Sequence, residues 1–122
     1  MELDRLEVKS DKRGSLVEAF KLPSDGQIFY IVIKPKKTRG NHYHLRKTEN
    51  FLVIWGSATL RAKNRDTGDI SAVETNGQSP TVVTMLPNNT HNITATDEGC
   101  ICMVWVDEQF NEKDPDTFAE KV

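Results

Sequence analysis

Gly40-Asn41-His42-Tyr43-His44-Leu45-Arg46-Lys47-Thr48-Glu49, followed seven residues later by Gly56, is the stretch on which the interpretation of this chain depends. Side chains alternate along a β-strand with a period of two, so His42 and His44 would point to the same face. The remaining histidine of the chain, His91, follows Pro87-Asn88-Asn89-Thr90. Histidine is the commonest metal ligand. If the intervening strands bring Glu49 and His91 alongside, these residues form one pocket.

The sequence around this stretch predicts an all-β fold. Short β-prone runs alternate with turn residues, and Asn-Gly or Asp-x-Gly pairs supply the positive φ that hairpins need. Regular short strands of this kind are typical of a sandwich or barrel. The expected strands are Ser15–Lys21, Ile28–Lys34, Asn50–Trp55, Ser57–Arg65, Ile70–Thr75, Thr81–Met85, His91–Ala95 and Cys100–Val106. The expected separators are Pro23–Gly26, Pro35–Gly40, Asp66–Asp69, Asn76-Gly77 and Asp97–Gly99.

Composition limits the range of possible functions. The 122 residues predict a single domain, residues 1–122, and the net charge of -2 gives no nucleic-acid or membrane-binding signal. No apolar run approaches the length of a membrane span, and the first residues carry acids rather than the hydrophobic part of a signal peptide. We therefore expect a cytoplasmic protein. Cys100 and Cys102 lie in an apolar run and are expected to be buried, reduced thiols.

The C-terminal tail is harder to assign. Residues Asp116–Lys121 form a weak helical candidate that is interrupted by Asp114-Pro115, and they fit an extended arm equally well. The acidic side chains of Asp107, Glu108 and Asp116 are predicted to lie at the surface or at an interface.

The glycine, H-x-H, glutamate and closing glycine between Gly40 and Gly56 resemble the first motif of the cupins. Cupins are small jelly-roll barrels, built as a double-stranded β-helix, that hold a metal or substrate in the barrel mouth. The second motif is looser. Asn88 stands where a glycine is usual, but asparagine tolerates the same left-handed turn, and Ala95 replaces the usual terminal asparagine.

The resemblance then narrows to the C-terminal cupin domain of the CapF-type capsular polysaccharide enzymes, similar to dTDP-sugar 3,5-epimerases. It covers nearly the whole chain and rests on Arg13–Leu16, Gly26-Gln27, Lys34-Pro35, Gly40–His44, Lys47, Glu49, Phe51–Val53, Thr90–Ile93, Trp105, Glu108, Phe110-Asn111 and Pro115–Thr117. The resemblance implies zinc binding and C3 epimerisation of a UDP-linked 4-keto-6-deoxy sugar. It also implies a reductase, which we expect on a separate polypeptide because this chain has no glycine-rich βαβ segment.

For this family the resemblance implies specific roles for individual residues. His42, His44, Glu49 and His91 are the expected ligands of a divalent metal, most simply zinc, although nitrogen-rich sites also take iron, manganese or nickel. A base must remove the C3 proton. His42 stands at the position of the catalytic histidine in metal-free epimerases, and if it binds metal, the other candidates are a metal-bound hydroxide, Lys47 and Tyr43.

Arg13 and Arg39 stand where related epimerases contact the nucleotide diphosphate, and guanidinium suits such contacts. Two alternatives remain open at this point. Besides metal-dependent C3 epimerisation, these are a metal-free 3,4-ketoisomerase that uses His42 and His44 as acid and base, and a non-catalytic cupin that binds a sugar or a metal. Two-fold symmetry is the commonest closed arrangement, so we expect a homodimer with a nucleotide sugar as its substrate. Ser15–Phe20 and Pro115–Val122 are the candidate contact segments.

Overall fold

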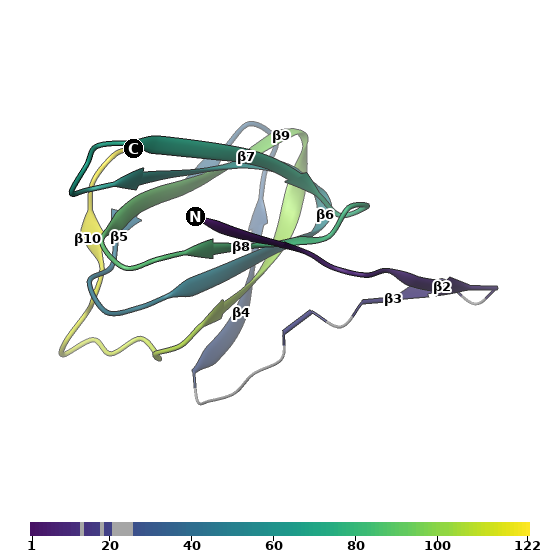
Figure 1. Ribbon diagram of the computed structural model, residues 1–122, viewed down its shortest axis with the longest axis horizontal. Coiled ribbons are helices and arrows are strands. Elements are labelled where there is room, and N and C mark those ends of the chain that lie inside the picture. Colours follow the sequence, from purple (N-terminus) through teal and green to yellow (C-terminus); the bar gives the residue numbers. More distant parts are fainter. Residues whose placement is uncertain (13, 18, 21–25) are drawn as a thin grey trace.

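The computed structural model describes residues 1–12, 14–17, 19, 20 and 26–122. Within these ranges it contains strands and no helix (Figure 1). The strands are β1 (Glu2–Arg5), β2 (Lys9–Asp11), β3 (Gly14–Leu16), β4 (Gln27–Ile33), β5 (Thr38–Tyr43), β6 (Glu49–Asn64), β7 (Ile70–Asn76), β8 (Thr81–Met85), β9 (Asn89–Val106) and β10 (Phe118–Ala119).

Two long strands, β6 and β9, organise the molecule because each of them contributes to both layers. The first part of β6 pairs with β8 and with the last part of β9, which also pairs with β4. The second part of β6 pairs with β7 and with the first part of β9, which also pairs with β5. All of these pairs are antiparallel, and the two layers enclose a common interior as in a jelly roll (Figure 1).

The bend between the layers is made by glycine. The β6–β9 register shifts between Val53 and Trp55 and again between Gly56 and Ala58. Gly56 has φ 73° and Gly99 has φ 77°, a conformation in which most side chains are strained. A Cβ atom built on Gly56 would lie 2.0 Å from the carbonyl oxygen of Gly99, so the two backbones can approach this closely only without a side chain. The closing glycine of the first motif is therefore a corner of the barrel.

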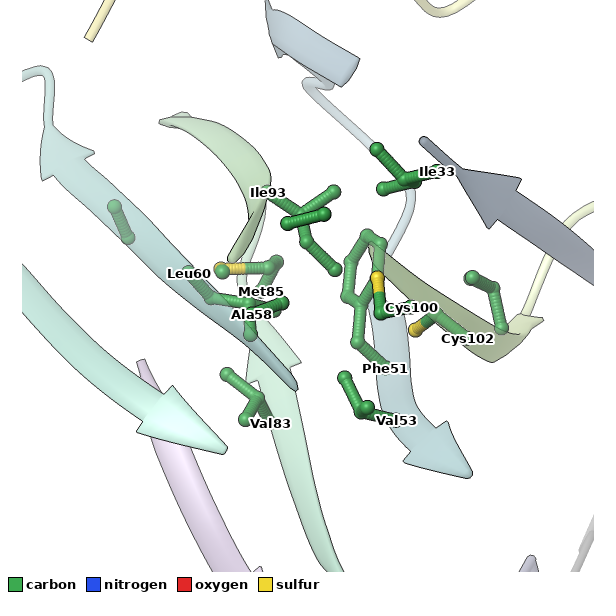
Figure 2. Packing of buried hydrophobic residues seen from close by; sticks show 13 residues of the cluster. Ile33, Phe51, Val53, Ala58, Leu60, Val83, Met85, Ile93, Cys100 and Cys102 are labelled. Atoms are coloured by element: carbon green, nitrogen blue, oxygen red, sulfur yellow. The ribbon is translucent and has the colours of Figure 1, made fainter. Parts of the chain in front are cut away.

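The core fills the space between the two layers (Figure 2). It is built from inward-facing residues of β4, β6, β8 and β9, among them Ile33, Phe51, Leu60, Val83 and Val104. Cys100 and Cys102 belong to the same cluster and are free thiols, as the sequence predicted. Burial raises the pKa of Cys102 to about 12, so this thiol stays protonated. The cysteines thus serve as small apolar core residues.

The expected turns after Asn64 and at Asn76-Gly77 are confirmed, and the first closes the hairpin between β6 and β7. The second joins β7 to β8, which do not pair with each other, and Gly77 lacks the expected positive φ. Two other expectations about separators were wrong. Asp97–Gly99 lies inside β9, and the end of Pro35–Gly40 already belongs to β5. The sequence also did not indicate β1 and β2. The tail is extended and forms β10, and the expected strand Ser15–Lys21 lies partly outside the described residues.

The described residues include no helix of the length and apolarity that a membrane crossing requires.

Candidate metal centre

A bulge in β5 aims the two histidines of the H-x-H segment. The register of β5 against β9 shifts between Gly40 and His42, and Gly40 and Asn41 have φ values of 94° and 57°. Such bulges re-aim side chains next to functional sites. After the bulge His42 pairs with His91 of β9, and His44 follows immediately after the end of β5. Glu49 enters from the start of β6.

The structure brings His42, His44, Glu49 and His91 together, and one ligand atom from each lies within 4.8 Å of all the others. The ring centroid of His42 is 4.9 Å from that of His44 and 4.8 Å from that of His91. Glu49 Oε1 lies 2.7 Å from His44 Nε2 and 3.1 Å from His91 Nε2. All but His42 are buried. Residues far apart in sequence therefore converge on one point.

Burial and mutual contact shift the protonation of this cluster. Burial, reinforced by His91 and His44, lowers the pKa of His42 to about 4, so this ring is neutral near pH 7. Burial also acts to lower the pKa of His44, but the hydrogen bond to Glu49 outweighs it and raises that pKa. For Glu49, burial opposes ionisation, yet the hydrogen bond from His44 and the neighbouring His91 hold its pKa well below the usual range. Glu49 is therefore a carboxylate.

The residues fit a divalent cation on two grounds. The donor set is three imidazoles and one carboxylate, which suits zinc and several other first-row ions. In addition, the buried Nε2 of His91 has no hydrogen-bond partner in the structure, although it lies near Glu49 Oε1. A buried polar atom without a partner is costly, and a metal ion at the centre of the cluster would satisfy it.

The cluster opens into a cavity of about 220 Å³ that is lined by His42, Glu49 and His91 together with Arg39 and Gly40. Phe29, Ile31, Phe51 and Ile93 complete its apolar wall. A cavity with an apolar wall and a few convergent polar groups is typical of small-molecule sites. Of the two predicted substrate-binding arginines, Arg39 lines this cavity, whereas Arg13 lies outside the described residues.

The other two predicted catalytic residues are not brought to the cavity wall. The ring of Tyr43 stacks on Phe118 with centroids 5.2 Å apart, and the guanidinium of Arg65 lies 3.7 Å from the centre of the Tyr43 ring. Lys47 is buried in the loop after His44, with its ammonium 5.5 Å from the centre of the Phe110 ring. Among the predicted bases, only His42 lines the cavity, and a catalytic role for Tyr43 or Lys47 stays a prediction.

The expectation that Asp116 lies at the surface was wrong, because its side chain is only 1% exposed. Its carboxylate accepts hydrogen bonds from backbone N–H groups of the loop that follows His44, and its carbonyl oxygen lies 2.5 Å from His44 Nδ1. Nothing in the sequence between His44 and Asp116 indicated this contact. The one indication that Asp116 matters was that Pro115-Asp116-Thr117 belongs to the residues on which the resemblance to the CapF-type domain rests.

The model of the family "Polysaccharide biosynthesis C-terminal domain" matches residues 9–118. The chain belongs to this family.

Two of the relatives that the chain matches are longer proteins. The chain is 42% identical over 112 residues to the UDP-2-acetamido-2,6-beta-L-arabino-hexul-4-ose reductase of Pseudomonas aeruginosa, covering 90% of this chain and 30% of the reductase. The crystal structure of the capsular polysaccharide assembling protein CapF from Staphylococcus aureus is 35% identical, with a TM-score of 0.77, over 96% of this chain and 33% of CapF. The chain thus spans about a third of the length of these relatives.

A third relative is similar in length to this chain. A double mutant of the QdtA 3,4-ketoisomerase from Thermoanaerobacterium thermosaccharolyticum, solved with TDP, is 28% identical with a TM-score of 0.77. The match covers 93% of this chain and 83% of QdtA. The predicted cupin jelly roll and the predicted resemblance to CapF are both confirmed. The left-handed turn expected at Asn88 is confirmed as well, with φ 60°.

Proposed function

We propose that this chain is a metal-dependent isomerase that epimerises C3 of a nucleotide-linked 4-keto-6-deoxy sugar in polysaccharide biosynthesis. The metal, zinc in the simplest case, would be held by His42, His44, Glu49 and His91. The observation that carries the proposal is that three members of this cluster, His42, Glu49 and His91, line one cavity together with Arg39. UDP is the proposed carrier because the name of the Pseudomonas aeruginosa relative specifies a UDP-linked 4-ulose.

The C3 proton of such a sugar is acidic only if the enolate that forms on its loss is stabilised. A bound divalent ion would supply a Lewis acid for the C4 ketone oxygen. The chain must also supply a base within hydrogen-bond reach of C3. His42 lines the cavity and is neutral near pH 7, so it has a lone pair available when it is not a metal ligand. Tyr43 and Lys47 remain the alternative bases if a substrate-induced movement brings them inward.

Arg39 is proposed to bind the diphosphate. It lies on the cavity wall, and its guanidinium can donate two parallel hydrogen bonds to a phosphate. Binding energy at the diphosphate would then orient the sugar at the reacting carbon. We extend the same role to Arg13 on the basis of the sequence resemblance.

Incubation of the purified, metal-analysed protein with a UDP-linked 4-keto-6-deoxy sugar in deuterated water tests the proposal. We expect one divalent ion per chain. We also expect deuterium uptake at C3, detected by NMR, without any nicotinamide cofactor. Chelation of the metal should abolish the exchange. A metal-loaded protein that binds the sugar nucleotide but never exchanges the proton would instead be a binding module.

Variants of two cavity residues separate binding from turnover. Arg39→Ala should mainly raise KM, and Glu49→Gln should mainly lower kcat through the metal. Lys37→Ala is the matched control, because Lys37 is an exposed cation of the same segment that does not line the cavity. If Arg39→Ala changes neither constant more than the control does, the diphosphate lies elsewhere.

A second candidate function is 3,4-ketoisomerisation without a metal. The similarity to QdtA over most of both chains favours it, as does the neutral state of His42. In that case His42 and His44 would act as acid and base, and activity would survive chelation. For either reaction we propose a cytoplasmic homodimer whose product passes to a reductase.

A further inference from the structure

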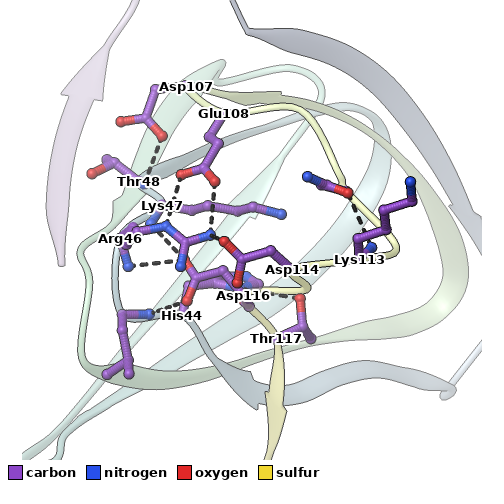
Figure 3. A network of polar contacts seen from close by, with 12 residues as sticks. His44, Arg46, Lys47, Thr48, Asp107, Glu108, Lys113, Asp114, Asp116 and Thr117 are labelled. Atoms are coloured by element: carbon purple, nitrogen blue, oxygen red, sulfur yellow. Dashed lines mark hydrogen bonds and ion pairs between the residues drawn. The ribbon is translucent and has the colours of Figure 1, made fainter.

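The buried carboxylate of Asp116 holds the loop that follows His44. Oδ1 accepts the backbone N–H of Leu45 at 2.8 Å, while Oδ2 accepts those of Arg46 at 2.8 Å and Lys47 at 3.0 Å (Figure 3). Hydrogen bonds to a charged acceptor are stronger than neutral ones, and here three converge on one side chain. The loop and the C-terminal segment around Asp116 are therefore fixed to each other.

The same residue contacts the His44 ring through its main chain. The carbonyl oxygen of Asp116 lies 2.5 Å from His44 Nδ1, and the hydroxyl of Thr117 lies 3.4 Å from the same nitrogen. A carbonyl oxygen can only accept a hydrogen bond, so Nδ1 carries a proton. The nitrogen left to coordinate an ion is Nε2, which is the one that faces Glu49. This contact thus selects the tautomer and sets the ring plane.

The other two rings of the cluster are held less tightly. The nearest carbonyl to His91 Nδ1 is that of Asn89, at 3.4 Å. Across the described ranges of the chain, the ring of His42 makes no hydrogen bond and contacts only the other rings and the cavity wall. His44 is accordingly the ring whose orientation depends on a distant part of the sequence.

We propose that Asp116 is a positioning residue for metal binding: its carboxylate anchors the C-terminal segment so that its carbonyl holds His44 in the ligating tautomer. This inference rests on the proposed metal site. Groups that orient a ligating histidine typically contribute 10- to 100-fold in metal affinity. The C-terminal segment is then part of the metal centre, although it supplies no ligand.

The test compares zinc affinity, measured by competition with a chromophoric chelator, in the wild type and in Asp116→Ala. We expect about a 10- to 100-fold loss of affinity. Glu120→Ala is the matched control, because Glu120 anchors the same segment through Arg65 and Thr90 without touching His44. The visible spectrum of the cobalt-substituted protein should shift in Asp116→Ala and stay unchanged in Glu120→Ala. Asp116→Asn, which keeps one acceptor oxygen, replaces the alanine variant if that variant does not fold.

Equal zinc affinity and equal cobalt spectra in the Asp116 and Glu120 variants would overturn the inference while leaving the metal site in place. A wild type that binds no divalent ion would instead overturn the metal site. In that event ¹⁵N NMR of the His44 ring decides the inference. A protected Nδ1 proton in the wild type that is lost in Asp116→Ala supports positioning by Asp116, and an unprotected one in both contradicts it.

Discussion

At the scale of single residues, Glu49 is the centre of the candidate site. Its Oε1 atom contacts both His44 and His91, and it is the one carboxylate of the four-residue cluster. Although burial opposes its ionisation, the hydrogen bond from His44 and the neighbouring His91 hold its pKa well below the usual range, so it is a carboxylate at neutral pH. Three rings and a fixed negative charge in a buried place form a site that attracts a cation strongly.

Replacement of His44 by alanine should release the ion and lower the thermal stability. A ligand that binds only the folded state stabilises it by about 2.7 kcal/mol when present at a hundredfold excess over its Kd. Added zinc should therefore raise the Tm of the wild type and leave that of His44→Ala unchanged, as measured by scanning calorimetry together with elemental analysis. Full metal occupancy in a His42→Ala, His44→Ala double variant would place the ion elsewhere.

The sequence predicted the four members of this cluster but not the residue that supports them. Strand periodicity indicates a shared face for His42 and His44, and the resemblance to the cupin motifs adds Glu49 and His91. Each contact of Asp116 joins a side chain to a main-chain group: its carboxylate accepts loop N–H groups, and its carbonyl contacts the His44 ring. Main-chain groups are present at every residue, so a contact of this kind between distant segments becomes visible only in the folded structure.

At the scale of elements, the corner between the two layers depends on Gly56. Gly56→Ala should destabilise the protein by more than about 3 kcal/mol, because the left-handed φ and a clash with the Gly99 carbonyl add up. Gly68→Ala is the control, since Gly68 has φ 80° but nothing within 4 Å of an added Cβ, and should cost only about 1–2 kcal/mol. Urea denaturation measures both. Equal losses would mean that the corner relaxes without cost.

The C-terminal segment should loosen in acid. A hydrogen bond from Thr90 and contacts with Arg65 lower the pKa of Glu120 in the folded protein. A lowered folded-state pKa gives a contribution that is complete above the unfolded pKa and is lost as the pH falls through the folded one. The difference in free energy of unfolding between wild type and Glu120→Gln should therefore shrink as the pH is lowered. A difference that stays constant down to pH 3 would show that ionisation of Glu120 does not matter.

The expected separators illustrate why elements were predicted better than their boundaries. Asp97–Gly99 and Asn76-Gly77 both end in a glycine, which can adopt positive φ, but the first continues β9 around a corner and the second is a turn between β7 and β8. Gly99 adopts a φ of 77°, whereas Gly77 does not adopt positive φ, so the same local signal accompanies two different conformations. The corner depends on the close approach of Gly56 to Gly99, and local sequence does not show it.

At the scale of the whole molecule, the outward side of β4 is apolar. Ile28, Tyr30 and Val32 alternate with inward residues and are 47%, 71% and 62% exposed. An exposed apolar sheet face usually marks an interaction surface. The predicted contact segment Pro115–Val122 is already engaged within its own chain through β10 and Glu120. This leaves the β4 face as the better location for the predicted homodimer contact.

Light scattering at micromolar concentration should give the mass of a dimer, and Tyr30→Glu should give that of a monomer. A buried charge without a partner opposes association. Ile70→Glu is the control, because Ile70 is 60% exposed on β7 and lies outside the β4 face. A wild type that remains monomeric at all concentrations would contradict the dimer, and an effect of equal size in both variants would remove the β4 face from consideration.

The two long strands also determine how the chain must reach its fold. Every layer contains part of the β6–β9 ladder, which joins Glu49 to Val106 and Asn64 to Asn89. The chain must therefore close long loops before either layer has a partner, and loop closure is entropically unfavourable until the contacts form. Proteins dominated by such non-local pairings fold in milliseconds to seconds. We therefore expect refolding to be slow and the recovery of metal binding to coincide with it.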